Sequence, residues 1–308
     1  MRSLAEAMSE GVIVLDGGLA TELERRGNDL SSSLWSARLL AEAPDEIVAA
    51  HSAYFRAGAQ VATTATYQAS FEGFATLGVD DAQAVVLMRR GVALAARARE
   101  ELAHEDDGEV GPDRWVAASV GPFGAMLADG SEYRGDYGLS VAELRTFHRH
   151  RLEVLAASGA DVLAIETIPC AVEVEALVLE LASLDIPAWI SLTCSGLMTR
   201  AGEPVEEVFS MAASAPSVIA VGINCTDPGD AEALVELASH TGKPVVVYPN
   251  SGERWNAGAR RWEGSAAFSV ADVRGWITAG ARLVGGCCRV GPAEIVALAR
   301  AAAVSGQD

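Results

Sequence analysis

Residues 218–223 read VIAVGI, an apolar run that ends abruptly at Asn224-Cys225-Thr226. A strand that is apolar at every position is typical of a parallel sheet buried on both faces. Further short apolar runs, most of them followed by a segment with helical periodicity, lie at residues 12–15, 60–66, 115–120, 162–165, 188–193, 244–248 and 282–284. Eight strand–helix units in 308 residues predict an α/β fold of the (β/α)₈ TIM-barrel type.

The main alternative is an open doubly wound sheet. That fold carries a glycine-rich phosphate loop with GxGxxG spacing after its first strand. Residues 16–21 read DGGLAT, which has two glycines without that spacing. The sequence also shows no linker, repeat or low-complexity segment. We therefore expect residues 1–308 to form a single barrel domain, with its core from about residue 12 to about residue 302.

Composition narrows the classes of partner. Half of the residues are hydrophobic, which permits a large core and excludes a disordered chain. With 23 basic and 42 acidic residues the net charge is −19, so we expect neither nucleic acid nor an anionic membrane surface as a partner. No apolar run reaches 18 residues, and the first residues lack the apolar core of a secretory signal. These features predict a cytoplasmic protein.

Three cysteines follow predicted strands. Cys225 comes directly after the sixth strand, and Cys287-Cys288 follow the eighth after Gly285-Gly286. The active site of such a barrel lies at the C-terminal ends of its strands, where these ends can converge. Three thiolates at one point suit a soft metal, most simply zinc, and leave one tetrahedral position open, as in catalytic zinc sites.

The other two cysteines, Cys170 and Cys194, are better explained as small core residues, since cysteine is among the most buried residue types. Structural disulfides are not expected in a reducing compartment.

Several segments resemble a known family. The stretches LDGGLATEL at 15–23, GINCT at 222–226 and GGCCR at 285–289 resemble the homocysteine S-methyltransferases. Four other stretches resemble the branch of this family that uses S-methylmethionine: YQASFEGF at 67–74, SVGPFG at 119–124, GSEYRG at 130–135 and YPNSGE at 248–253. The resemblance extends from about residue 12 to about residue 302.

The resemblance implies zinc-dependent transfer of a methyl group from S-methylmethionine to homocysteine, giving methionine, with S-adenosylmethionine as a second donor. It implies that Cys225, Cys287 and Cys288 hold the Zn²⁺ and so activate the homocysteine thiol. Betaine-dependent enzymes share this three-cysteine site, so a betaine–homocysteine methyltransferase is the first alternative. A zinc hydrolase and a non-catalytic metal-binding barrel are two more. The hydrolase is less favoured, because such enzymes prefer His and carboxylate ligands and no His follows a predicted strand.

The substrate residues follow from the same resemblance. Asp16 and Glu166 match the family positions that bind the homocysteine ammonium group. The turn at Gly17 and Gly18 is expected to offer backbone N–H groups to the substrate carboxylate. Asn224 precedes a metal ligand and is expected to brace that part of the substrate site. The partners are then homocysteine and a sulfonium donor, with the chain a monomer or small homo-oligomer.

Two long segments are expected on the active-site face. Residues 123–139 contain Glu132, Tyr133 and Tyr137, and residues 250–264 contain Trp255 and Trp262. Aromatic rings and carboxylates suit a sulfonium cation, although both segments can equally be mobile surface loops. The histidines are expected in helices or at helix ends and on the surface; they are His51, His104, His148, His150 and His240.

Overall fold

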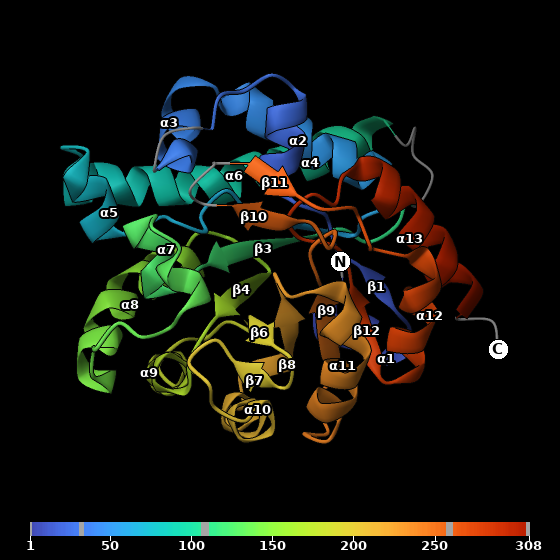
Figure 1. Cartoon of the computed structure of the whole chain (residues 1–308). Coiled ribbons are helices and arrows are strands. Elements are labelled where there is room, and N and C mark those ends of the chain that lie inside the picture. Colours follow the sequence, from blue (N-terminus) through green and yellow to red (C-terminus); the bar gives the residue numbers. More distant parts are fainter. Residues whose placement is uncertain (1, 31–33, 106–110, 257–260, 306–308) are drawn as a thin grey trace.

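The structure, a computed structural model, describes residues 2–30, 34–105, 111–256 and 261–305, and in these residues eight parallel strands form a barrel with helices around it (Figure 1). From the second strand to the eighth, each strand pairs with the next along the chain in parallel, and the eighth pairs with the first. The predicted fold is therefore confirmed. The barrel strands are β1 (Ile13–Val14), β2 (Val61–Thr63), β3 (Trp115–Val120), β4 (Val162–Ile168), β5 (Ala188–Leu192), β8 (Val218–Asn224), β9 (Val245–Tyr248) and β12 (Ala281–Val284).

The barrel closes through its shortest strand. On one side β1 pairs with β12 over two residues. On the other side, β1 is joined to β2 by an isolated bridge between Leu15 and Val61 and by the Gln60 N–H, which donates to the Val14 carbonyl at 2.7 Å. The β1–β2 seam thus has the fewest ladder bonds of the ring.

Helices cover the outside of the barrel because their apolar faces pack on the strands. Buried side chains of the helices and the outward strand positions form one large core, and inward strand positions form a smaller one. The outer helices are α2 (Leu19–Arg25), α3 (Trp35–Glu42), α4 (Pro44–Arg56), α5 (Phe71–Thr76), α6 (Asp81–Glu105), α8 (Val141–Ala156), α9 (Ala171–Leu181), α10 (Val205–Ala213), α11 (Ala231–Ser239), α12 (Val270–Thr278) and α13 (Pro292–Ser305).

A short helix that the sequence analysis did not predict, α1 (Leu4–Glu10), lies at the N-terminal ends of the strands. Trp115, the first residue of β3, donates its ring N–H to the Arg2 carbonyl at 3.1 Å, which fixes this position. Leu4 and Met8 of α1 are buried with the inward-facing core residues of the barrel. The end of the barrel opposite the expected active site is therefore filled by apolar side chains.

The strand ends differ from expectation at several places. Residues 115–120 form a strand as predicted, but β4 continues to Ile168, so Glu166 lies inside a strand rather than after it. The segment expected as a loop at 123–139 contains a helix, α7 (Phe123–Leu127), and a 3₁₀ turn, η1 (Ser131–Tyr133). The segment at 250–264 contains a hairpin of β10 (Arg254–Asn256) and β11 (Arg261–Glu263), which crosses the middle of the view in Figure 1. Residues 257–260 and the side chains of Trp255 and Trp262 lie outside what the structure describes.

The expectation that all histidines are on the surface is wrong for two of them. All five lie in helices or at a helix end, but His51 and His148 are fully buried. His148 bonds through Nε2 to Glu173 at 2.9 Å. Burial lowers the pKa of His51 to about 4, so its ring is neutral at pH 7.

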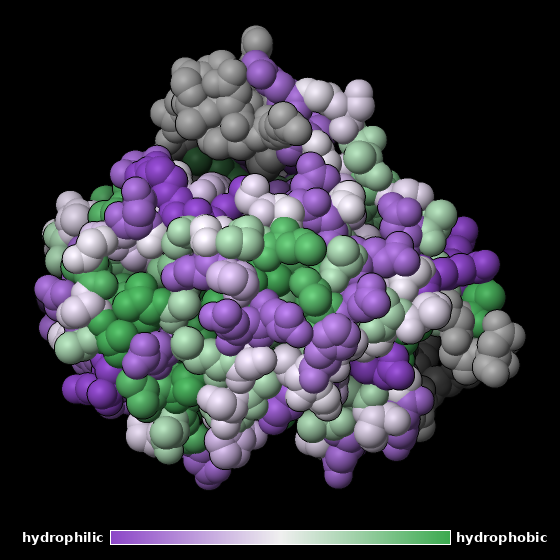
Figure 2. Space-filling view, turned by 60° about the horizontal axis from the view of Figure 1, so that its bottom comes forward, coloured by the Kyte–Doolittle hydropathy of each residue, from purple (hydrophilic) through white to green (hydrophobic). Residues whose placement is uncertain are grey.

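The outer surface of the barrel is largely hydrophilic on the face drawn in Figure 2. Hydrophilic residues are spread between smaller hydrophobic areas on the face seen in Figure 2. Among the described residues, no helix has both the length and the apolar character needed to cross a bilayer.

Candidate active site

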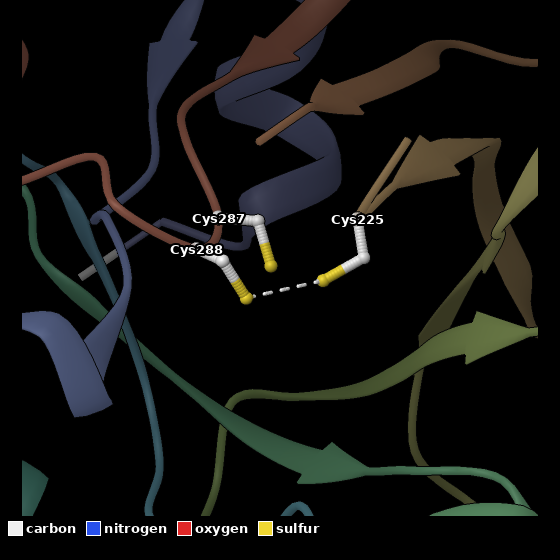
Figure 3. Close-up of side chains that lie close together, drawn as sticks. All are labelled: Cys225, Cys287 and Cys288. Carbon is white, nitrogen blue, oxygen red and sulfur yellow. Dashed lines mark hydrogen bonds between the residues drawn. The ribbon is translucent and has the colours of Figure 1, made fainter. Parts of the chain in front are cut away.

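Three cysteines meet at the C-terminal end of the barrel. Cys225 follows β8, and Cys287 and Cys288 follow β12, with β9 as the only strand between these two. Their sulfur atoms all lie within 4.8 Å of one another, and the Sγ atoms of Cys225 and Cys288 are 3.8 Å apart. Figure 3 shows the three side chains pointing toward one another. The convergence predicted from the strand positions is therefore present.

The two remaining cysteines take no part in this cluster. Cys170 precedes α9, and Cys194 lies in the small hairpin of β6 (Cys194–Ser195) and β7 (Met198–Thr199). Both are buried, and burial raises the pKa of Cys194 to about 12, so its thiol stays protonated. This agrees with their interpretation as core residues.

Glycines allow the cysteine pair to reach this position. A Cβ atom on Gly285 would lie 2.6 Å from the Cβ of Leu15, and one on Gly286 would lie 2.2 Å from a methyl carbon of Val290. The chain after β12 therefore passes in direct contact with the chain after β1. The Cys287 N–H donates to the Pro249 carbonyl at 2.8 Å, which fixes the backbone of the pair.

Cys225 has a left-handed backbone conformation, with φ at +47°. This conformation costs a non-glycine residue about 1–3 kcal/mol and is maintained only where the surroundings determine it. Here the Cys225 N–H donates to the Tyr248 carbonyl, and the Thr193 hydroxyl donates to the Cys225 carbonyl at 3.1 Å. The local backbone is therefore held so that the thiol points at the cysteine pair.

The three thiols also interact electrostatically. Hydrogen bonds from Cys225 and Cys287 hold the pKa of Cys288 well below its usual value, while Cys225, Cys288 and burial raise the pKa of Cys287. One thiolate is thus stabilised by two thiols next to it. Such a group of soft, readily ionised sulfur donors can hold a soft metal ion.

Two buried carboxyl groups lie at the same end of the barrel. On β4, Glu166 accepts a hydrogen bond from the Ser119 hydroxyl, and burial raises the pKa of Glu166 to about 7. Asp16, after β1, accepts hydrogen bonds from the Thr63 N–H at 2.7 Å and the Thr63 hydroxyl at 2.9 Å. Burial raises the pKa of Asp16 to about 8, and the charge of Glu166 contributes. Within the described residues neither carboxylate forms an ion pair, so both can accept a cationic ligand.

The side-chain amide of Asn224 forms hydrogen bonds with other residues of the protein. Its Oδ1 accepts from the Thr167 N–H at 2.6 Å and the Ser191 hydroxyl at 2.9 Å, and its Nδ2 donates to the Thr167 hydroxyl at 2.7 Å. Thr167 is the residue after Glu166 and has a left-handed φ of +62°. The amide of Asn224 therefore stabilises the backbone that carries Glu166.

The glycine turn after β1 is also closely packed. A Cβ on Gly17 would lie 2.3 Å from the Val290 carbonyl oxygen, and one on Gly18 would lie 2.7 Å from that of Cys287. The Gly18 N–H already donates to the Val290 carbonyl at 3.0 Å. In this structure the two glycines mainly permit the close approach of β1 and the cysteine segment.

Several residues of the site were not predicted from the sequence. Thr63, Ser119 and Ser191 are polar positions inside otherwise apolar strands, and this is the signal that identifies them in retrospect. The Tyr248 hydroxyl lies 2.8 Å from the Ser191 hydroxyl and extends the polar network. Tyr133 of η1 is close enough to the Cys225 thiol to lower its pKa, so the 123–139 segment does reach the thiols.

The fold and the site define a class of protein: a (β/α)₈ barrel whose mouth holds three thiols able to bind a metal, next to two carboxyl groups able to bind a cation. A family model described as homocysteine S-methyltransferase matches residues 13–302. The chain belongs to the homocysteine S-methyltransferase family, and it is an enzyme of that family.

Individual relatives cover nearly the whole chain. Homocysteine S-methyltransferase YbgG of Bacillus subtilis is 46% identical over 94% of this chain and 93% of its own length. The homocysteine S-methyltransferase of Escherichia coli is 47% identical over 94% of both chains. A crystal structure of the E. coli homocysteine methyltransferase MmuM in its metallated form superposes with a TM-score of 0.86 at 44% identity, covering 96% of this chain and 98% of that one.

Proposed function

We propose that this enzyme uses Zn²⁺ held by Cys225, Cys287 and Cys288 to transfer a methyl group from S-methylmethionine to homocysteine, giving methionine. The observation that carries the proposal is the meeting of three sulfur atoms within 4.8 Å beside buried carboxyl groups. That a relative, the E. coli homocysteine methyltransferase MmuM, has a metallated form supports a bound metal in this enzyme as well. Free thiols this close together need a reducing compartment to stay reduced, so we place the reaction in the cytoplasm.

The three sulfur ligands fit zinc. Thiolates are soft ligands, and three of them complete all but one position of a tetrahedral site. Zinc bound there supplies a Lewis acid that lowers the pKa of the homocysteine thiol, so that the nucleophilic thiolate exists at neutral pH.

The chain's own residues bind and orient the substrates. Glu166 and Asp16, when ionised, pair with the ammonium group of homocysteine and fix the direction of its side chain. Asn224 keeps the backbone at Thr167 in its left-handed conformation and so keeps Glu166 in place. The Gly17–Gly18 turn shapes the wall next to the substrate carboxylate.

The reaction itself needs little acid–base chemistry. The sulfonium donor leaves as a neutral thioether, so no general acid has to protonate it. What the protein contributes is alignment of donor sulfur, methyl carbon and acceptor sulfur, which is worth several orders of magnitude in rate.

The donor preference rests on the segments that resemble the S-methylmethionine branch. One of them, GSEYRG at 130–135, contains η1, and its Tyr133 acts on the pKa of Cys225. A pocket built for the small S-methylmethionine discriminates sterically against S-adenosylmethionine with its adenosyl group. Betaine lacks the amino-acid portion and carries its charge on nitrogen. The expected order is therefore S-methylmethionine, then S-adenosylmethionine, with negligible activity for betaine.

A donor panel tests this proposal. Specificity constants are measured for the three donors at saturating homocysteine, with methionine as the product, on zinc-loaded and chelator-treated enzyme. We expect activity only with zinc and the donor order given above. Betaine as the best donor would identify a betaine–homocysteine methyltransferase. Absence of methyl transfer with every donor, with zinc bound, would leave the hydrolase and the non-catalytic barrel as the remaining interpretations.

A further inference from the structure

We propose that Glu132 recognises the methyl donor by pairing with the α-ammonium group of the sulfonium amino acid. This inference rests on the proposed function and deepens it, because it assigns a donor-specific residue next to the thiols.

The first observation is that Glu132 is presented by a well-packed element. A Cβ on Gly124 of α7 would lie 2.4 Å from the Glu132 backbone nitrogen, so α7 and η1 are in direct contact. The Phe123 N–H, at the start of α7, donates to the buried Glu173 at 2.6 Å. The buried Ser131 accepts a hydrogen bond from Arg134 at 2.6 Å. The carboxylate therefore has a defined position in the protein before any ligand binds.

The second observation is that one oxygen of this carboxylate lacks a partner. The Oε2 atom of Glu132 is buried and has no hydrogen-bond partner in the part of the chain that the structure describes. The Arg134 guanidinium lies 3.6 Å from Asp129 and from Asp136, and its charge only partly offsets burial, which raises the pKa of Glu132 to about 7. A buried carboxylate oxygen without a partner is costly, and a cationic ligand would reduce that cost.

The third observation is its place relative to the thiols. Its neighbour Tyr133 acts on the pKa of Cys225, and the charge of Cys225 acts on Glu132. The charge of Cys225 acts on Glu166 too, but Glu166 also acts on Asp16, and these two carboxyl groups are the pair assigned above to the acceptor. Glu132 reaches the thiols from the α7–η1 segment, which leaves it available to the second substrate.

The course of the methyl transfer indicates which positive group of the donor Glu132 pairs with, the sulfonium or the ammonium. During transfer the donor methyl–sulfur bond breaks, a bond from that carbon to the homocysteine sulfur forms, and the electron pair of the broken bond stays on the donor sulfur. The sulfonium charge and the thiolate charge both disappear. A carboxylate at the sulfonium would stabilise the ground state more than the transition state and slow the reaction. The ammonium keeps its charge throughout, so a carboxylate there strengthens binding without raising the barrier.

The test is the Glu132→Gln variant of the zinc-loaded enzyme with two donors. One donor is S-methylmethionine, and the other is (3-carboxypropyl)dimethylsulfonium, which is the same molecule without the amino group. We expect KM for S-methylmethionine to rise by about tenfold to a hundredfold, with kcat nearly unchanged, as for loss of a charge-assisted hydrogen bond. The specificity constant for the deaminated donor should be the same in both proteins.

Matched variants control for folding and for loop effects. Asp136→Asn removes an exposed charge from the same segment and should leave the KM of both donors unchanged. Glu132→Asp keeps the charge and should recover part of the affinity for S-methylmethionine that Glu132→Gln loses. Zinc content and melting temperature of Glu132→Gln should match the wild type.

Several results would overturn the inference. An equal loss for both donors would place Glu132 at the sulfonium, and a raised KM for homocysteine would place it with the acceptor. Unchanged kinetics would show that it binds neither. A wild-type enzyme that does not use S-methylmethionine would refute the proposed function instead, which is a separate outcome.

Discussion

Replacing Glu166 by Gln is the most direct test of how the enzyme holds homocysteine. The substitution keeps the shape of the side chain, and the amide oxygen can still accept the hydrogen bond of Ser119. What it removes is the negative charge that we propose pairs with the substrate ammonium group. Because the carboxyl group is only 7% exposed, water cannot replace that charge effectively.

The size of the effect follows from this burial. A hydrogen bond to a charged group contributes about 1.5–3 kcal/mol, and each 1.36 kcal/mol is a factor of ten in affinity. The dissociation constant for homocysteine should therefore rise by about 10- to 150-fold. Zinc content should stay the same, since Glu166 is not a metal ligand in this site.

Calorimetric titration of zinc-loaded protein with L-homocysteine and with 4-mercaptobutanoate, its analogue without the amino group, measures this effect. Wild type should bind the analogue more weakly than homocysteine, and Glu166→Gln should narrow this difference, with Asp16 left as the remaining partner of the ammonium group. The exposed Glu175→Gln change on the following helix is the matched control and should leave both affinities unaltered. Equal weakening for both ligands, or an unchanged affinity for homocysteine, would refute the assignment.

Three further outcomes are expected. Cys225→Ser should lower zinc below one ion per chain by metal analysis; full zinc in the variant would exclude Cys225 as a ligand. Binding of L-methionine, which has no thiol, should weaken as pH falls from 8 to 6. The pKa values of Asp16 and Glu166 are raised to about 8 and about 7, so at pH 6 both groups are protonated and cannot pair with an ammonium group. A binding constant that does not change from pH 6 to 8 would contradict this. Asn224→Ala should lower the free energy of unfolding, measured by denaturant titration, by about 1–3 kcal/mol, because it leaves the buried Thr167 N–H without its acceptor. An unchanged free energy of unfolding would show that water replaces the amide.

The barrel and the thiol cluster were predictable from the sequence for a physical reason. Strand identity and order follow from apolar runs, and the C-terminal ends of parallel strands in a closed barrel point the same way. Topology brings Cys225 and the pair after residue 286 to the same end of the barrel. The glycines at 285 and 286 and the left-handed backbone of Cys225 then point the thiols at one another.

The partners of the carboxyl groups were not predictable in this way. That Thr63 bonds to Asp16, and Ser119 to Glu166, depends on the register between neighbouring strands, and a shift of one residue would turn these side chains to the other face. Apolar patterning specifies which face of a strand is buried but does not identify which hydroxyl reaches which carboxylate.

Two errors had a visible signal. His148 follows Leu144 by four residues and thus shares the buried face of its helix, so helical periodicity alone predicts its burial. Helix α1 begins with a capping box in which Ser3 and Glu6 cap each other, a short sequence pattern that marks a helix start.

The contact between Gly286 and Asp16, in which the Gly286 N–H donates to the Asp16 carbonyl at 3.2 Å, has a consequence for how the enzyme matures. A ribosome adds about 5–20 residues per second, so Asp16 is made about 15–50 s before Cys288. Until residues 287 and 288 are made, the nascent chain has at most Cys225, which is one thiol of the three. A metal that needs all three thiols can therefore bind only after residue 288 has been synthesised, when every strand of the barrel has already been made.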